Sequence, residues 1–205
     1  MADVKMIATR ESYGNTLKAL AAEGHDDLVV LDADLAAATK TGVFRKAHPD
    51  RHFDCGIAEA NMMGVAAGLS TMGYVPFVSS FAMFAAGRAF EQIRNSVAYP
   101  HLEREDRRYP PAAISVGEDG ASHQCCEDFA LMRSLPGHDH SSAPPDDVEA
   151  RAAVRAAYEM QGPCLPPLWS VWRFPCSTMR PTITSRSARA SSSPRAVILP
   201  SWPPA

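Results

Sequence analysis

Helical and strand patterns alternate along the first 160 residues, and this alternation limits the chain to a small group of folds. Residues 9–23 repeat apolar side chains at helical spacing, and Leu28–Asp32 is a short apolar run that ends in an acid, as buried parallel strands often do. Such alternation is typical of a doubly wound, mostly parallel sheet flanked by helices. The sequence therefore predicts an α/β fold of about five or six strands. Its further strands are expected over 53–57, 74–79 and 112–116, and its further helices over 59–72, 81–97, 125–135 and 146–160.

The composition changes abruptly after residue 163. Residues 164–205 contain no Asp, Glu, Gly or Lys, but eight Pro, eight Ser and five Arg. Their net charge is +5, whereas residues 1–163 carry −8, from 15 basic and 23 acidic side chains. A segment of this composition has no apolar face to bury. We therefore divide the chain into a domain over 1–163 and an irregular Pro/Ser/Arg-rich tail over 164–205.

Composition and charge exclude several classes of protein. Of the 205 residues, 46% are hydrophobic, which is enough for a packed core. No apolar run reaches the ~20 residues that span a bilayer, and the N-terminus lacks the apolar stretch of a secretory signal. A formal net charge of −3 disfavours nucleic-acid binding, and five irregularly spaced cysteines indicate neither a disulfide framework nor a zinc site. We predict a cytoplasmic protein that binds neither membranes nor nucleic acid and has no metal site of its own.

Two segments carry unusual sets of polar residues. The first, residues 53–69, places Glu59 at the start of a helix whose other side chains are nearly all small or apolar. A glutamate in this position can simply complement the helix dipole. The second, Gly117-Glu-Asp-Gly-Ala-Ser-His-Gln124, is a glycine-rich loop crowded with groups that donate, accept or titrate. Such a loop can equally be a solvated turn, so the residues alone leave both interpretations open.

Together with two further segments, these stretches resemble the pyrimidine-binding domain of the transketolase family. The matching pieces are Asp32-Ala-Asp-Leu35, Gly56-Ile-Ala-Glu-Ala-Asn-Met62, residues 77–87 and the loop that begins at Gly117. They occur in the order of the family, over about residues 10–160. The resemblance implies the thiamine diphosphate-binding fold. More closely, the chain is similar to the C-terminal subunit of a split transketolase, whose N-terminal partner subunit binds the diphosphate and a divalent metal such as Mg²⁺.

The resemblance assigns the cofactor contacts to four residues. Glu59 would hydrogen-bond a ring nitrogen of the thiamine aminopyrimidine and act in catalysis, because sharing a proton there favours the imino tautomer. Phe81 and Phe84 match aromatic positions that pack on the pyrimidine, although their spacing also fits an ordinary core. Asp34 matches an acid near the cofactor and the substrate channel.

The resemblance assigns the substrate contacts to the second segment. Asp119 and His123 match positions that contact substrate hydroxyls, and His123 would also act in catalysis. A carboxylate and an imidazole can discriminate a sugar from a less hydroxylated analogue. The implied reaction transfers a two-carbon ketol unit between sugar phosphates, as in the pentose phosphate pathway, in a homo- or hetero-oligomer. Two alternatives stay open: another thiamine enzyme, such as 1-deoxyxylulose-5-phosphate synthase or the pyruvate dehydrogenase β subunit, and a non-catalytic remnant of the fold.

Three segments depart from the family pattern. Residues 103–111 and 138–145 are rich in charge and proline where the family has buried strands, and residues 164–205 stand where it has a strand with a phosphate-binding Arg. Pro111 falls where a catalytic His is expected. Because the pattern resumes in register after the first two segments, we hypothesise that all three are frame-shifted and that the family sequence is truncated. A clean single frame in the resequenced coding DNA would refute this. We expect the isolated chain to be inactive.

Overall fold

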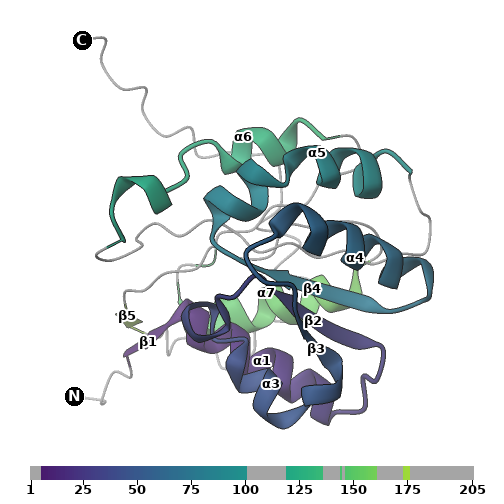
Figure 1. Cartoon of the computed structure of the whole chain (residues 1–205). Coiled ribbons are helices and arrows are strands. Elements are labelled where there is room, and N and C mark those ends of the chain that lie inside the picture. Colours follow the sequence, from purple (N-terminus) through teal and green to yellow (C-terminus); the bar gives the residue numbers. More distant parts are fainter. Residues whose placement is uncertain (1–5, 101–118, 136–143, 145, 161–172, 176–205) are drawn as a thin grey trace.

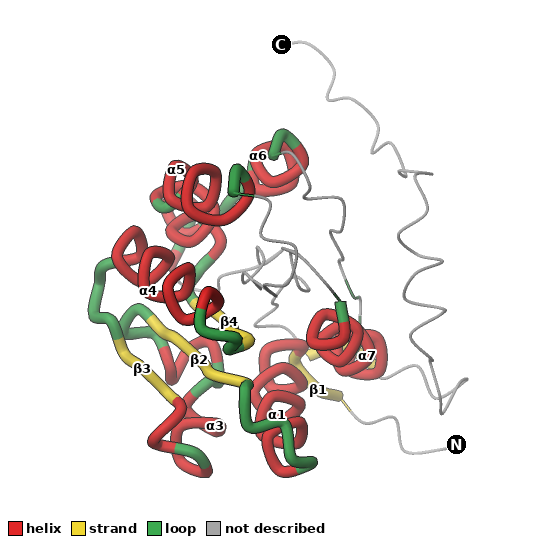
Figure 2. Tube along the Cα trace, turned by 90° about the vertical axis from the view of Figure 1, so that its right-hand side faces the viewer, coloured by secondary structure: helices red, strands yellow, loops and turns green. Residues whose placement is uncertain are grey.

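The computed structural model describes residues 6–100, 119–135, 144, 146–160 and 173–175 (Figure 1). Three parallel strands form the described part of its central sheet, in the order β3-β2-β4. They are β2 (Leu28–Asp32), β3 (His52–Asp54) and β4 (Val75–Ser79). Helices cover both faces of this sheet (Figure 2). The predicted α/β fold, with a parallel sheet flanked by helices, is therefore confirmed.

The central strand β2 is buried on both faces. Leu28 and Val30 pack in one apolar cluster, whereas Val29 and Leu31 pack in the other. Successive side chains of a strand point to opposite faces, so a strand covered on both sides has to be apolar at every position. This burial explains why the sequence shows a continuous apolar run there instead of an alternation.

One face of the sheet is covered by α1 (Thr9–Ala22), α3 (Gly42–Ala47) and α7 (Asp147–Glu159). The helices predicted over 9–23 and 146–160 are thus confirmed. The side chains that fill this layer are large and fully buried: Tyr13, Leu17, Phe44, Phe77 and Val154. Two short elements that the sequence pattern did not predict, α2 (Ala36–Thr39) and η1 (Pro49–Arg51), connect β2 to β3 on either side of α3.

The opposite face is covered by α4 (Glu59–Thr71), α5 (Phe90–Ile93) and α6 (Asp128–Arg133). Met62 and Met63 of α4 pack there with Ile93 and Met132. The single long helix predicted over 81–97 is interrupted by two π-helical stretches, η2 (Met83–Arg88) and η3 (Arg94–Ala98). Small residues in η2 leave room for the wider turn, in which the Ala89 amide donates to the carbonyl five residues earlier.

A second, antiparallel pair of strands joins the two ends of the described chain. β1 (Met6–Ala8) pairs with β5 (Arg173–Pro175), with Ile7 opposite Phe174. The sequence pattern predicts neither strand, because three residues are too few to show a period. The strand expected over 112–116 lies outside the described residues, as does nearly all of the three segments that depart from the family pattern. No helix in the described ranges is long and apolar enough to cross a membrane.

Candidate active site

The predicted site residues follow strands that end at the same edge of the sheet. Asp32 is the last residue of β2 and Asp34 lies two residues beyond it, while Phe81 lies two residues beyond β4. Glu59 opens α4, which follows β3. The carboxyl ends of parallel strands meet at one edge, and ligands of open α/β sheets bind there. The topology therefore gathers these segments where a ligand is expected.

Glu59 is a buried acid at this edge. Its side chain is 2% exposed, and its Oε2 has no hydrogen-bond partner among the described residues. The nearest opposite charge is Nη1 of Arg88, 3.4 Å from Oε2, on a side chain that is 60% exposed. The N-terminal end of α4 also favours a negative charge at this position. A buried polar atom without a hydrogen bond costs about 1–3 kcal/mol, so Oε2 is a candidate contact for a polar ligand atom.

Three of the predicted residues form a cluster of rings. The centroids of Phe81 and Phe84 lie 6.2 Å apart, and the imidazole of His123 lies 5.7 Å and 5.2 Å from them. The imidazole meets both phenyl rings edge-on, an arrangement that aromatic pairs favour. Its Nδ1 is 3.0 Å from the hydroxyl of Ser122. All three rings are partly exposed, so they present apolar surface to a ligand.

The π-helical stretch η2 connects the ring cluster to the buried acid. It carries Phe84 near its start and Arg88 at its end, and Arg88 forms the ion pair with Glu59. α4 packs against η2, so the two sides of the candidate site belong to neighbouring helices. Single π-helical turns inside helices occur frequently at functional sites. Sequence reasoning missed Arg88, because its pairing with Glu59 joins two separate helices and no local pattern indicates it.

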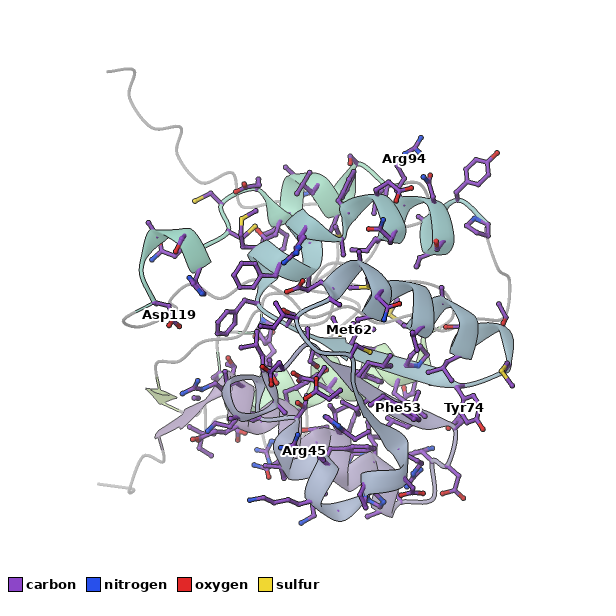
Figure 3. The ribbon with its side chains drawn as sticks, viewed as in Figure 1. Arg45, Phe53, Met62, Tyr74, Arg94 and Asp119 are labelled. Atoms are coloured by element: carbon purple, nitrogen blue, oxygen red, sulfur yellow. The ribbon has the colours of Figure 1, made fainter. Side chains whose placement is uncertain are left out.

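The other two predicted residues are exposed. Asp34 has a left-handed backbone, with φ of 58°, and its amide donates to Oδ1 of Asp54 at 3.0 Å. The same oxygen accepts from the amide of Gly56 at 3.0 Å, in the turn that leads to Glu59. Asp119 lies at the outer edge of the molecule, beyond η5 (Ala121–His123) (Figure 3). The structure thus ties Asp34 to the turn before α4 and leaves Asp119 at the periphery.

Asp32 is a second buried acid, which sequence reasoning did not assign to the site. It accepts hydrogen bonds from the Leu35 amide at 2.5 Å and from the hydroxyls of Thr39 and Thr41 at 3.0 Å and 2.6 Å. These bonds fix the loop that contains Asp34. Burial raises the pKa of the Asp32 carboxyl from its usual 3.8 to about 6, and the three hydrogen bonds only partly offset this effect. Its position at the end of an apolar strand was the available signal.

No group of three or more His, Cys, Asp or Glu side chains in the described ranges could hold a metal ion. The groups that the site offers are a buried carboxyl, a guanidinium, an imidazole and two phenyl rings. This set can bind a flat heterocycle, with a hydrogen bond at one ring edge and apolar contact on its faces.

Comparisons with known proteins identify the family of the chain. Residues 5–165 match the model of the family described as "Transketolase, pyrimidine binding domain". A transketolase C-terminal section from Methanocaldococcus jannaschii is 50% identical over 154 residues, which cover 75% of this chain and 48% of that protein. Human transketolase is 40% identical over 161 residues, which cover 77% of this chain and 25% of that protein. The chain therefore spans about half the length of the first relative and a quarter of the second.

Solved structures show the same fold. A split-gene transketolase, described as an inactive β4 tetramer, superposes with a TM-score of 0.74 at 48% identity and covers 88% of this chain and 56% of its own. Transketolase from Leishmania mexicana superposes with a TM-score of 0.75 at 24% identity, covering 92% of this chain and 28% of its own, and this likeness shows the fold alone. With a family match across residues 5–165 and the fold of a split-gene transketolase at 48% identity, the chain belongs to the transketolase family.

Proposed function

We propose that this chain is the pyrimidine-binding subunit of a transketolase-type transferase, which uses thiamine diphosphate to move a two-carbon ketol unit between sugar phosphates. The observation that carries this proposal is the buried Oε2 of Glu59, which has no hydrogen bond within the described part of the chain. Arg88 connects this atom to the π-helical stretch that also carries Phe84. A binding site for a heterocycle explains why the fold keeps such an atom in its interior.

The residues present fit the pyrimidine of this cofactor. A carboxyl group can share a proton with a ring nitrogen, and the burial of Glu59 would keep solvent away from such a contact. Phe81 and Phe84 offer apolar faces to the ring, while Asp34 lies on the neighbouring loop. When bound, thiamine diphosphate supplies the carbon acid whose conjugate base adds to a ketose carbonyl. We assign the substrate hydroxyls to His123 and, from the segment before it, Asp119.

We further propose that a second chain completes the site. An N-terminal subunit would hold the diphosphate and Mg²⁺, because the relative from M. jannaschii is described as the C-terminal section of a transketolase and the related solved structure is described as that of a split-gene transketolase. The related split-gene protein, which is described as an inactive tetramer of β chains, supports the expectation that this chain is inactive alone and assembles into oligomers. A cytoplasmic location stays a prediction from the sequence.

Reconstitution with an N-terminal transketolase subunit tests the proposal. The purified complex is assayed with a ketose phosphate donor and an aldose phosphate acceptor, and its melting temperature is measured with and without thiamine diphosphate and Mg²⁺. A ligand at about 100 times its Kd stabilises the binding state by about 2.7 kcal/mol, so a clear rise in melting temperature is expected. Glu59→Gln should abolish most of the activity. Glu91→Gln, which changes an exposed acid on α5, is the matched control and should leave the activity unchanged.

Two results would count against the proposal. A complex that forms but shows neither ketol transfer nor stabilisation by thiamine diphosphate would favour a non-catalytic remnant. A Glu59→Gln complex with wild-type activity would show that this carboxyl does not act on the cofactor. Use of pyruvate as the donor, with release of its carboxylate as CO₂, in place of a ketose phosphate would instead favour one of the other thiamine enzymes.

A further inference from the structure

The loop that carries Asp34 and the turn that leads to Glu59 lie on different crossover connections of the sheet. The first follows β2 and the second follows β3. Neither segment is a helix or a strand at the residues concerned, so its backbone position is not fixed by a regular ladder of hydrogen bonds. Both Asp34 and Gly56 have left-handed backbones, with φ of 58° and 67°. For a residue with a side chain, such as Asp34, this conformation is unfavourable unless the surroundings hold it.

One carboxylate oxygen joins these two segments. Oδ1 of Asp54 accepts from the Asp34 amide and from the Gly56 amide, each at 3.0 Å. The left-handed turns direct both N–H groups to this oxygen. A carbonyl or carboxylate oxygen has two lone pairs and can accept two hydrogen bonds, so a single side chain can hold both turns.

The backbone of Asp54 is itself firmly placed. It is the last residue of β3 and lies in register with Asp32 at the end of β2. The next amide, that of Cys55, donates to the Asp32 carbonyl at 2.8 Å, so the pairing of the two strands continues past Asp54. The strand pairing therefore fixes the backbone that carries the Asp54 carboxylate.

Two carboxylates hold different parts of the loop after β2. Asp32 binds its later part through the Leu35 amide and the hydroxyls of Thr39 and Thr41. Within the described residues, the Asp34 amide donates to the side chain of Asp54. The same Asp54 oxygen reaches the turn three residues before Glu59. The loop that carries Asp34 and the turn that leads to Glu59 are thus both held by the same oxygen of Asp54.

We propose that Asp54 is a positioning residue that fixes Asp34 relative to Glu59 and thereby sets the affinity of the site for the cofactor. The part about the cofactor rests on the proposed function, whereas the part about the two backbone segments does not. Asp54 does not have to contact the cofactor for this role. Because the role depends on one acceptor oxygen, an amide side chain of the same shape should preserve it.

Amide hydrogen exchange of the full chain, followed by NMR, tests the anchor without any ligand. In Asp54→Ala, the amides of Asp34 and Gly56 should exchange at least about tenfold faster, the factor that about 1.4 kcal/mol corresponds to. In Asp54→Asn, which keeps the acceptor, their rates should stay close to those of the wild-type chain. Asp50→Ala, which removes an exposed acid of η1, is the matched control. Unchanged rates in Asp54→Ala, or equal acceleration in Asp54→Asn, would overturn the proposal.

The complex with the N-terminal subunit tests the consequence for the cofactor. Asp54→Ala should raise the thiamine diphosphate concentration for half-maximal activity by about tenfold, while Asp54→Asn restores it. A loosened Asp34 amide with an unchanged cofactor requirement would overturn the positioning role and leave the proposed function intact. If the wild-type complex ignores thiamine diphosphate, the proposed function fails and the cofactor part of this role falls with it. The exchange rates would then still decide whether Asp54 joins the two segments.

Discussion

The buried carboxyl of Asp32 should make the stability of the folded chain depend on pH. Its pKa is about 6 in the folded chain and 3.8 for an ordinary Asp, so the folded chain binds this proton more tightly than the unfolded chain does. The resulting stabilisation is fully present below about pH 4 and is lost as the pH rises through 6. The rise is about two pKa units, and each unit corresponds to about 1.4 kcal/mol, so the loss is about 3 kcal/mol.

Asp32→Asn removes the titration and keeps most of the contacts. The amide oxygen can accept from the Leu35 amide, and the NH₂ group can donate to the hydroxyl oxygens of Thr39 and Thr41, which the carboxylate now accepts from. Urea unfolding of the isolated chain, followed by circular dichroism at pH 4, 5, 6 and 7, gives the free energy of unfolding of both proteins. The wild-type value should fall relative to the Asn variant by about 2 kcal/mol between pH 4 and pH 7, because part of the full loss occurs below pH 4.

All other titrating groups are common to the two proteins and cancel in the difference. Asp50→Asn, at an exposed position, should run parallel to the wild-type chain. If the difference between wild type and Asp32→Asn stays constant from pH 4 to pH 7, the three hydrogen bonds fully compensate for burial, and the reasoning is refuted. A difference that grows in favour of the wild-type chain as the pH rises would mean that these bonds outweigh burial.

Three further changes follow from the packing. Gly14→Ala should destabilise the chain by about 1–3 kcal/mol, because the new Cβ would lie 2.1 Å from the Lys40 carbonyl oxygen; Gly64→Ala, which meets open space in α4, should be neutral or stabilising in the same urea unfolding measurement. Phe77→Ala should lower the free energy of unfolding by about 3–5 kcal/mol, since this ring of β4 is fully buried in the cluster that contains the side chains of α1. A loss below about 1 kcal/mol would contradict its assignment to the core. Arg88→Gln should cost about 1 kcal/mol at neutral pH by removing the partner of a buried carboxylate, with a smaller loss for Arg88→Lys; the effect is modest because the guanidinium is largely exposed.

The sequence predicted the elements that are long or continuously apolar. All five residues of β2 are buried, and the six buried residues of α4 recur at helical spacing, so both patterns could be recognised locally, and the α/β class followed from the alternation of helices and strands. The π-helical stretch η2 could not be predicted, because its wider turn reflects how small residues pack against α4, and a 3.6-residue period does not reveal this. β1 and β5 are three residues long, and their pairing joins segments more than 160 residues apart.

The candidate site divides in a similar way. Glu59, Phe81, Phe84 and His123 were named from the family resemblance, and the structure places the three rings in one cluster and the acid in the interior. The contacts of Asp32, Asp54 and Arg88 were missed. Each of them depends on a partner from another segment, and the position of that partner is set only when the sheet has formed.

The two buried acids at this edge show how burial can serve different purposes. Asp32 is fully buried and accepts three hydrogen bonds, so contacts that order a loop offset part of the cost of its burial. Glu59 is buried almost as deeply, yet its Oε2 has no hydrogen bond within the described ranges. Its ion-pair partner is the largely exposed guanidinium of Arg88, at 3.4 Å.

A fold selected for stability alone would satisfy the second carboxyl as it satisfies the first, because an unsatisfied buried oxygen costs about 1–3 kcal/mol. The contrast therefore separates a structural acid from one kept available for a ligand. Phe84 of the ring cluster lies on η2, the stretch that pairs with Glu59 through Arg88, and not on the loop that Asp32 orders. Polar satisfaction, and not burial, is the property that distinguishes the acid of the candidate site.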